Sequence, residues 1–193
     1  MAAVDDLPTV GFASRDAWAE WLEDAHADAA GVWLKIPKAG SGETGVSYAE
    51  ALEVALCFGW IDGQKRKLDD RFWLQRFTPR RPKSIWSRIN RDKVLALIER
   101  GEMRPAGLRE VERAQADGRW DAAYEPQSAI GVPDDLRAVL DANEAAATAF
   151  AALDSANRYA ILHRVHTAKK PETRARRIVS FVEMLAGGGK IHS

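Results

Sequence analysis

The residues of this sequence that are best suited to catalysis or ligand binding lie between positions 57 and 91. Asp62 follows Trp60 and precedes Gly63. A carboxylate within reach of Arg80 or Arg81 could serve as a general base or as a polar anchor for a ligand. Asp followed by Gly is also a common turn dipeptide, so Asp62 could instead hold a hairpin turn. The sequence leaves both interpretations open.

Cys57 is the second, weaker catalytic candidate and the chain's single cysteine. It lies near the expected end of a helix, where the helix dipole disfavours a thiolate. A nucleophilic thiol also needs a positioned base, and no histidine is close to Cys57 in the sequence. Its apolar neighbours Leu56 and Phe58 favour a small core residue. A lone cysteine also excludes an internal disulfide and a multi-cysteine zinc site.

A predicted anion site lies at the start of the helix expected over residues 84–100. Ser87 and Asn90 are one turn apart and share a face with Ser84. Free amides and the helix dipole favour negative charge at such a helix start. Capping by Ser84 or Ser87 is the alternative. The predicted ligand-binding set comprises Trp60, Asp62, Arg80, Arg81, Trp86, Ser87 and Asn90.

A second basic group opens the last expected helix, where cations oppose the dipole of the first turn. It predicts a partner-binding surface made of Lys169, Lys170, Arg174 and Arg177. His163 and His166 are spaced i, i+3, as two metal ligands on a helix would be, but the local sequence offers no third ligand. No metal site is predicted.

The net charge of zero, from 28 Lys plus Arg against 28 Asp plus Glu, conceals an uneven distribution. Residues 62–93 carry 11 basic and 4 acidic groups, and residues 163–193 carry 7 and 2. If both blocks lay on one face they could bind nucleic acid. Such binding is not favoured, because the charge of the whole chain is even.

The pattern of elements predicts an α+β protein. Strands are expected over residues 9–13 and 31–36, with a hairpin over 60–78, giving a small antiparallel sheet. Covering helices are expected over 14–26, 47–58, 84–100 and 105–117; Ser47 and Glu50 match a capping box. From Pro133 onward, four short helices suit a C-terminal helical bundle module. The predicted domains are residues 1–127 and 128–193.

The sequence predicts a cytoplasmic protein without membrane insertion. No run of eighteen apolar residues exists, and a bilayer-spanning helix needs about twenty. Residues 1–11 carry acids where a signal peptide has a basic start and an apolar stretch. A single cysteine also fits a reducing compartment.

The heptapeptide Cys57–Gly63 resembles the signature of the bacterial YdeI/OmpD-associated family. The resemblance continues through Phe77–Arg80, Ser84, Trp86–Ser87, Asn90 and Ala168–Arg174, and extends from about Phe12 to Leu185. It implies a role in protection against bacteriocins or antimicrobial stress and association with an outer-membrane porin. It implies no settled reaction, substrate or cofactor.

The expected function is therefore a non-enzymatic tolerance factor that binds an anionic small molecule or a protein partner and needs no cofactor. One alternative is a small metal-independent enzyme using Asp62. Another is a nucleic-acid-binding protein using the two basic blocks.

Overall fold

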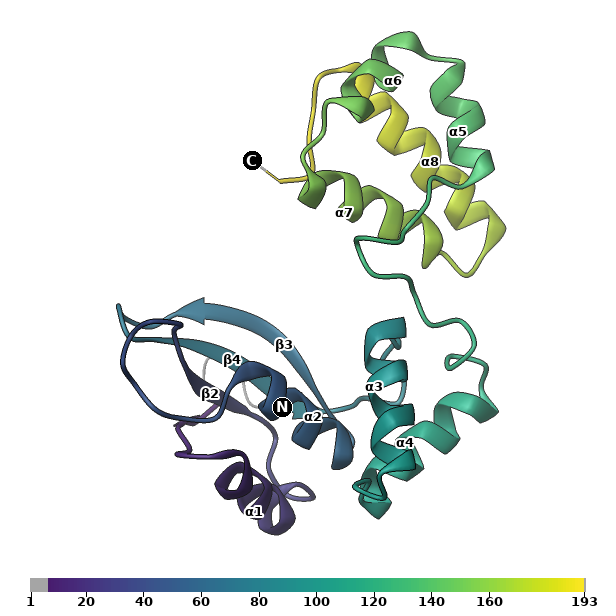
Figure 1. Cartoon of the computed structure of the whole chain (residues 1–193). Helices are drawn as coiled ribbons and strands as arrows, with labels where there is room; N and C mark the ends of the chain where they lie inside the picture. The colour runs from purple at the N-terminus through teal and green to yellow at the C-terminus, as the bar shows by residue number, and fades with distance from the viewer. Residues whose placement is uncertain (1–6, 193) are drawn as a thin grey trace. The chain divides into compact units, whose positions relative to one another are not determined.

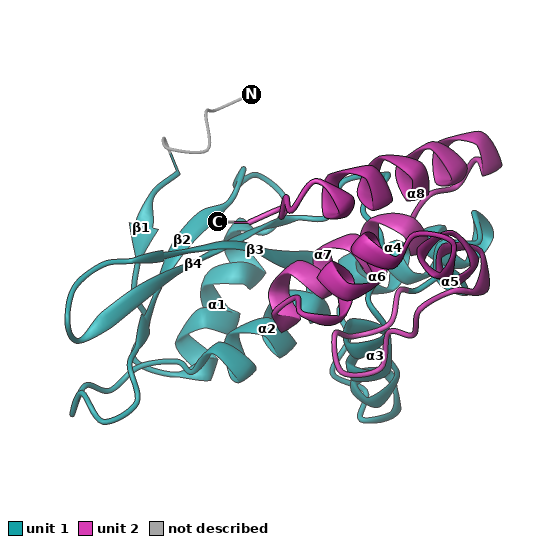
Figure 2. Cartoon of the chain, turned by 90° about the horizontal axis from the view of Figure 1, so that it is seen from above, with its two compact units in different colours: residues 1–123 teal, residues 124–193 magenta. Residues whose placement is uncertain are grey.

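The computed structural model describes residues 7–192, within which the chain forms eight helices and four strands (Figure 1). The predicted α+β class is confirmed. The chain divides into two compact units, unit 1 over Met1–Ala123 and unit 2 over Tyr124–Ser193 (Figure 2). Residues 1–6, which carry the acids behind the expectation of no signal peptide, lie outside the described residues.

The sheet of unit 1 has the strand order β1-β2-β4-β3. The strands are β1 (Thr9–Val10), β2 (Val32–Pro37), β3 (Trp60–Lys67) and β4 (Phe72–Pro79). The pairs β2–β4 and β4–β3 are antiparallel, but β1 runs parallel to β2. The sheet is thus mixed, and the prediction of an antiparallel one was wrong at this edge. A helix lies between β1 and β2 and returns the chain to the same end of the sheet, as a parallel pairing requires.

Two helices, α1 (Arg15–Ala25) and α2 (Tyr48–Cys57), pack against one face of the sheet. Ser14 caps α1 by accepting from the backbone N–H of Ala17 at 3.2 Å. The predicted capping box at Ser47 and Glu50 is confirmed. The apolar face of α1 buries Trp18 against β2 and β4, and its indole N–H donates to the carbonyl of Ala51 in α2 at 3.1 Å.

The β3–β4 hairpin turns at Asp69, not at Asp62. The Asp69 carboxylate accepts from the backbone N–H groups of Phe72 at 2.7 Å and Arg71 at 2.8 Å, which lowers its pKa below the ordinary value. Asp62 lies within β3, where the register shifts between Asp62 and Lys65. The turn interpretation of Asp62 was therefore wrong: Asp62–Gly63 begins a bulge, which adds a residue to one strand and re-aims it.

Two further helices, α3 (Arg88–Glu99) and α4 (Pro105–Ala116), complete unit 1. The helix expected from residue 84 begins only at Arg88. Ser84 accepts from the backbone N–H of Arg81 at 3.0 Å in a turn, and Ser87 caps α3 by accepting from the N–H of Asn90 at 3.1 Å. The capping alternative for Ser87 is thus confirmed.

The end of α2 and the start of α4 pack backbone to backbone. The N–H of Arg104 donates to the carbonyl of Cys57 at 3.1 Å. Gly59 leaves α2 with φ +74°, and a Cβ there would lie 3.0 Å from the carbonyl oxygen of Ala106. Gly107 faces Cys57 so closely that a Cβ would enter the space of the Cys57 carbonyl. Both positions need glycine for this approach.

Unit 2 is the predicted helical bundle. Its helices are α5 (Asp134–Asp141), α6 (Glu144–Ala151), α7 (Ser155–His166) and α8 (Pro171–Ala186). They bury a core of their own, which includes Leu136, Phe150 and Ile161. Among residues 7–192, no helix has the length and apolar character needed to cross a membrane.

Candidate functional site

Cys57 lies in the core of unit 1 with 4% of its surface exposed. Burial, and to a lesser extent the nearby charge of Glu102, raises the pKa of its thiol to about 11. A thiol in this state is protonated at neutral pH and poorly nucleophilic. The geometry favours the core interpretation of Cys57.

We expect Cys57 in the native protein to react with Ellman's reagent at pH 8 on the order of 100-fold more slowly than in protein unfolded in urea, because the thiolate fraction falls with the raised pKa. The measurement is the absorbance of the released thionitrobenzoate over time. Equal rates in the native and unfolded protein would show that Cys57 is accessible and ionised.

Trp60 and Asp62 connect β3 to the helices that cover the sheet. The Trp60 side chain is 1% exposed, and its indole N–H donates to the carbonyl of His26 at 3.1 Å. The Asp62 carboxylate accepts from the Tyr48 hydroxyl at 2.9 Å, so it is tied to the first residue of α2. The side chains of Trp60 and Asp62 thus both have hydrogen-bond partners within unit 1.

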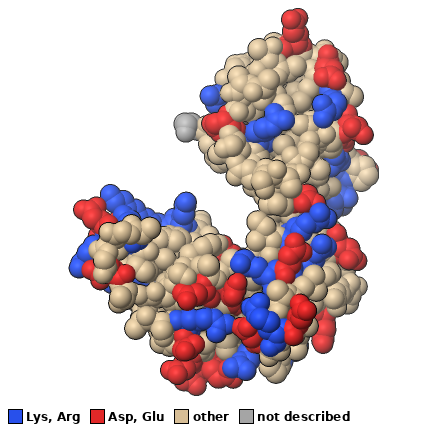
Figure 3. Space-filling view, viewed as in Figure 1, with Lys and Arg blue, Asp and Glu red and all other residues tan. Residues whose placement is uncertain are grey.

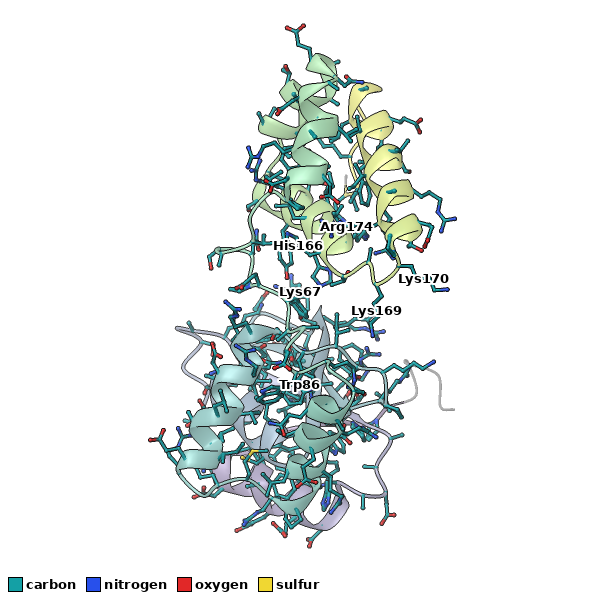
Figure 4. All side chains as sticks on the ribbon, turned by 90° about the vertical axis from the view of Figure 1, so that its right-hand side faces the viewer. Lys67, Trp86, His166, Lys169, Lys170 and Arg174 are labelled. Carbon is teal, nitrogen blue, oxygen red and sulfur yellow. The ribbon has the colours of Figure 1, made fainter. Side chains whose placement is uncertain are left out.

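Arg80 and Trp86 form a packed pair inside unit 1. The Arg80 guanidinium lies 3.5 Å from the centre of the Trp86 ring and donates to the carbonyl of Ile85 at 3.3 Å. Their exposed fractions are 6% and 2%, and Figure 4 shows Trp86 among the interior side chains of unit 1. The Trp120 ring packs edge-on against Trp86 at 4.9 Å.

The structure therefore packs Arg80 against Trp86 in the connection before α3, and places Ser87 and Asn90 at the start of that helix. Asn90 is buried and Arg81 is exposed. Arg80 and Trp60 line a hollow of about 180 Å³. This volume is smaller than the roughly 300 Å³ of a typical small-molecule site.

A larger, basic hollow lies on the β3–β4 hairpin, and we call it the hairpin pocket. Its volume is about 440 Å³, and its lining residues are Lys38, Lys65, Arg66, Lys67 and Trp73. Four of the five are cations and none is acidic. In Figure 3, Lys and Arg side chains gather over this end of unit 1.

The strand register explains how the hairpin pocket forms. Lys65 pairs with Gln75 and Lys67 with Trp73, so both lysines lie on the Trp73 side of the sheet. Arg66 lies on the other side, where its guanidinium stacks 4.3 Å from the Trp33 ring.

Two residues outside β3 support the hairpin pocket. The Lys38 ammonium donates to the carbonyl of Asp69 at 2.6 Å, which draws it to the hairpin turn. The Tyr48 ring packs against Trp73 with 5.8 Å between ring centres. The pocket thus combines a half-buried indole ring with positive charge.

The predicted partner surface on unit 2 is divided between internal and exposed groups. The Arg174 guanidinium forms an ion pair with Asp135 at 2.5 Å and donates to the carbonyl of Val165 at 2.9 Å. Lys169 and Lys170 are exposed before α8, whereas Arg174 lies against the bundle (Figure 4). Arg177 donates to the carbonyl of Arg164 at the end of α7.

The two histidines of α7 contact different groups. His166 lies 3.0 Å from the carbonyl oxygen of Gly131. His163 packs between the rings of Tyr124 and Tyr159. Within residues 7–192, no three His, Cys, Asp or Glu side chains are grouped closely enough to hold a metal ion.

Each of the two units contains a segment that matches a family model. Residues 10–110, more than half of the chain, match the family described as Domain of unknown function (DUF8412). The chain belongs to this family. Residues 129–188 match the family described as Bacteriocin-protection, YdeI or OmpD-Associated, so the DUF8412 segment is followed by a YdeI/OmpD-associated module. No curated protein and no solved structure matches the chain.

The suspected YdeI/OmpD-associated membership is confirmed for the C-terminal module. The Cys57–Gly63 heptapeptide lies in the DUF8412 segment. There its cysteine, tryptophan and aspartate serve the core and the contacts between β3 and its covering elements.

The sequence reasoning missed the hairpin pocket in the DUF8412 segment, although two signals pointed to it. Part of the basic excess of residues 62–93 falls on β3, which carries Lys65, Arg66 and Lys67. The alternation of β3 predicts that Lys65 and Lys67 share a face. Neither signal shows that Lys38, from the loop after β2, joins them.

Proposed function

We propose that the protein is a non-enzymatic tolerance factor against bacteriocins or related antimicrobial stress, and that it acts in the cytoplasm by binding an anionic ligand in the hairpin pocket. The match of residues 129–188 supports the bacteriocin-related role. The observation that carries the ligand class is a hollow whose lining includes the three lysines Lys38, Lys65 and Lys67 and one indole ring, with no acid among the lining residues.

The size and composition of the pocket favour an anion that also carries a flat ring. Its volume of about 440 Å³ falls within the range of small-molecule sites, which is roughly 300–1,000 Å³. The half-buried Trp73 can stack on a planar group, while Lys65 and Lys67 neutralise an attached phosphate or carboxylate. A nucleotide-like anion has both parts.

A binding role has more support than catalysis by Asp62. The Asp62 carboxylate is engaged by the Tyr48 hydroxyl and does not line the hairpin pocket. Cys57 is buried with a raised pKa. The two catalytic candidates are therefore separate from the pocket that could hold a ligand.

The test is calorimetric titration of the full chain with adenosine triphosphate, tripolyphosphate and adenosine. We expect the nucleotide to bind more tightly than either part alone. In Lys65→Gln/Lys67→Gln, affinity should fall at least about 10-fold, because each lost charge-assisted contact contributes about 1.5 kcal/mol or more. Affinity should also weaken as salt rises, since exposed charges are screened.

Arg81→Gln is the matched control, because it removes an exposed cation of unit 1 outside the pocket. If Arg81→Gln loses ligand binding and the double variant keeps it, the anion site lies near the start of α3 and the proposal is refuted. The lysines of the edge strand β3 also discourage pairing between sheets of different molecules. If they act only in this way, the double variant will aggregate without losing affinity.

The biological part of the proposal is tested by bacteriocin challenge of cells that lack the protein. Cells supplied with the unaltered chain or with Arg81→Gln should survive alike, and cells supplied with the double variant should be as sensitive as cells without the protein. Full protection by a stably folded double variant would separate tolerance from the hairpin pocket.

A further inference from the structure

Unit 2 carries a hollow of its own on the face of α7 that points away from the core of unit 2, and we call it the α7 groove. Its volume is about 600 Å³. Ala156 and Ala160 form part of its lining, together with Tyr159 and His163 from the same helix. Arg164 and Arg177 supply positive charge, and the lining residues include no acid.

The spacing of α7 explains why this face does not enter the core of unit 2. Ile161, Leu162 and Val165 face the core of unit 2. Positions 156, 159, 160, 163, 164 and 167 recur at helical spacing on another face. Because Ala156 and Ala160 are small, the larger Tyr159 and His163 side chains stand above them and leave a hollow.

The groove residues are held in place by contacts within unit 2. The Thr167 hydroxyl donates to the carbonyl of His163 at 2.7 Å. The rings of Tyr124 and His163 pack edge-on at 4.6 Å. Burial, and then the positive charge of the neighbouring Arg164, lower the pKa of His163 below its ordinary value. The imidazole is thus neutral at pH 7 and presents an aromatic surface.

Arg177 of α8 reaches across to the end of α7, where its guanidinium donates to the carbonyl of Arg164. The side chains of Arg164 and Arg177 both line the groove. The Arg164 guanidinium donates from one nitrogen to the carbonyl of Ala160 at 3.0 Å. The other N–H groups of the two guanidinium groups suit the recognition of carboxylates. The aromatic and small residues beside them suit an apolar side chain.

We propose that the α7 groove binds a short acidic peptide segment of a protein partner, with an apolar side chain over Ala156 and Ala160 and carboxylates on Arg164 and Arg177. From residue 156 to residue 167 the helix rises about 16 Å, which matches roughly five residues of extended peptide. The apolar floor distinguishes this site from the hairpin pocket and favours a peptide over nucleic acid. Of the predicted partner-binding residues, only Arg177 lines the groove.

The test uses the full chain and a displayed library of random seven-residue peptides. The library is first depleted on Ala160→Phe, which fills the groove from a half-exposed position, and is then selected on the unaltered protein. We expect enriched peptides to combine acidic residues with at least one large apolar residue. Their affinity, measured by fluorescence anisotropy, should fall at least 10-fold in Ala160→Phe and at least 5-fold in Arg164→Gln.

Two controls separate this site from other basic surfaces. Arg176→Gln removes an exposed cation of α8 that does not line the groove, so the affinity should not change. Lys65→Gln/Lys67→Gln should also bind the peptides with unchanged affinity. A failure of the proposed anion binding in the hairpin pocket can then be distinguished from a failure of peptide binding in the α7 groove.

Four results would overturn the proposal: no enrichment, enrichment of peptides without acids, equal losses in Arg164→Gln and Arg176→Gln, or tighter binding of oligothymidylate that depends on Arg164. The last result would assign the surface to single-stranded nucleic acid. Circular dichroism of Ala160→Phe establishes that the helices remain intact.

Discussion

Gly107→Ala should destabilise unit 1 by about 3 kcal/mol, a large fraction of the stability of a domain. A Cβ on Gly107 would lie 2.8 Å from the carbonyl carbon of Cys57 and closer still to its oxygen. Alanine improves helix propensity by about 1 kcal/mol. That gain is smaller than the expected loss, because the obstacle is backbone, which cannot rotate away. The start of α4 must separate from the end of α2.

The measurement is urea unfolding followed by tryptophan fluorescence. All seven tryptophans lie at or before position 120, within unit 1, so the signal reports this unit alone. Gly11→Ala is the matched control, because its Cβ would meet Lys35 at an ordinary 3.6 Å and should change stability by less than about 0.5 kcal/mol. Equal stabilities of Gly107→Ala and Gly11→Ala would refute the close approach of α2 and α4.

Ile161→Ala should destabilise unit 2 by about 2–5 kcal/mol while leaving unit 1 folded. Ile161 is fully buried in the core of unit 2, and truncation removes three methyl or methylene groups and leaves a cavity. A unit of this size has a stability of about 4–10 kcal/mol. The substitution therefore removes much of it.

Far-ultraviolet circular dichroism, which detects the helices of both units, should show an early loss of helix in Ile161→Ala. The tryptophan transition should stay at the urea concentration of the unaltered protein. Val179→Ala, at a side chain 48% exposed on α8, should change neither signal by more than about 0.5 kcal/mol. If Ile161→Ala shifts the tryptophan transition as well, the two units unfold as one cooperative structure.

The elements with local signals could be predicted from the sequence. Ser47 and Glu50 identify the start of α2 because a capping box is completed within one turn. Asp69, Asp70 and Pro79 delimit β4 in the same local way. The start of α3 was misplaced because Ser84 and Ser87 are both good caps, and only the hydrogen bond from Asn90 to Ser87 decides between them.

The candidate sites depend on contacts that sequence spacing does not contain. Arg80 and Trp86 were expected to face a ligand, because Arg and Trp are typical of binding surfaces. Instead the guanidinium stacks on the indole ring, and both side chains are buried inside unit 1. The hairpin pocket, by contrast, needs Lys38 from a separate loop. Arg174 was expected to bind a partner, but its carboxylate partner, Asp135, lies on α5, 39 residues earlier.

Because the two units have separate cores, substitutions in one unit should evolve largely independently of substitutions in the other. Each core cluster consists of residues from one unit alone. Substitutions without shared neighbours have additive effects on stability. Epistasis should therefore be strong inside each unit and weak between units. Recombination near residues 124–133 would exchange one module without requiring compensating substitutions in the other.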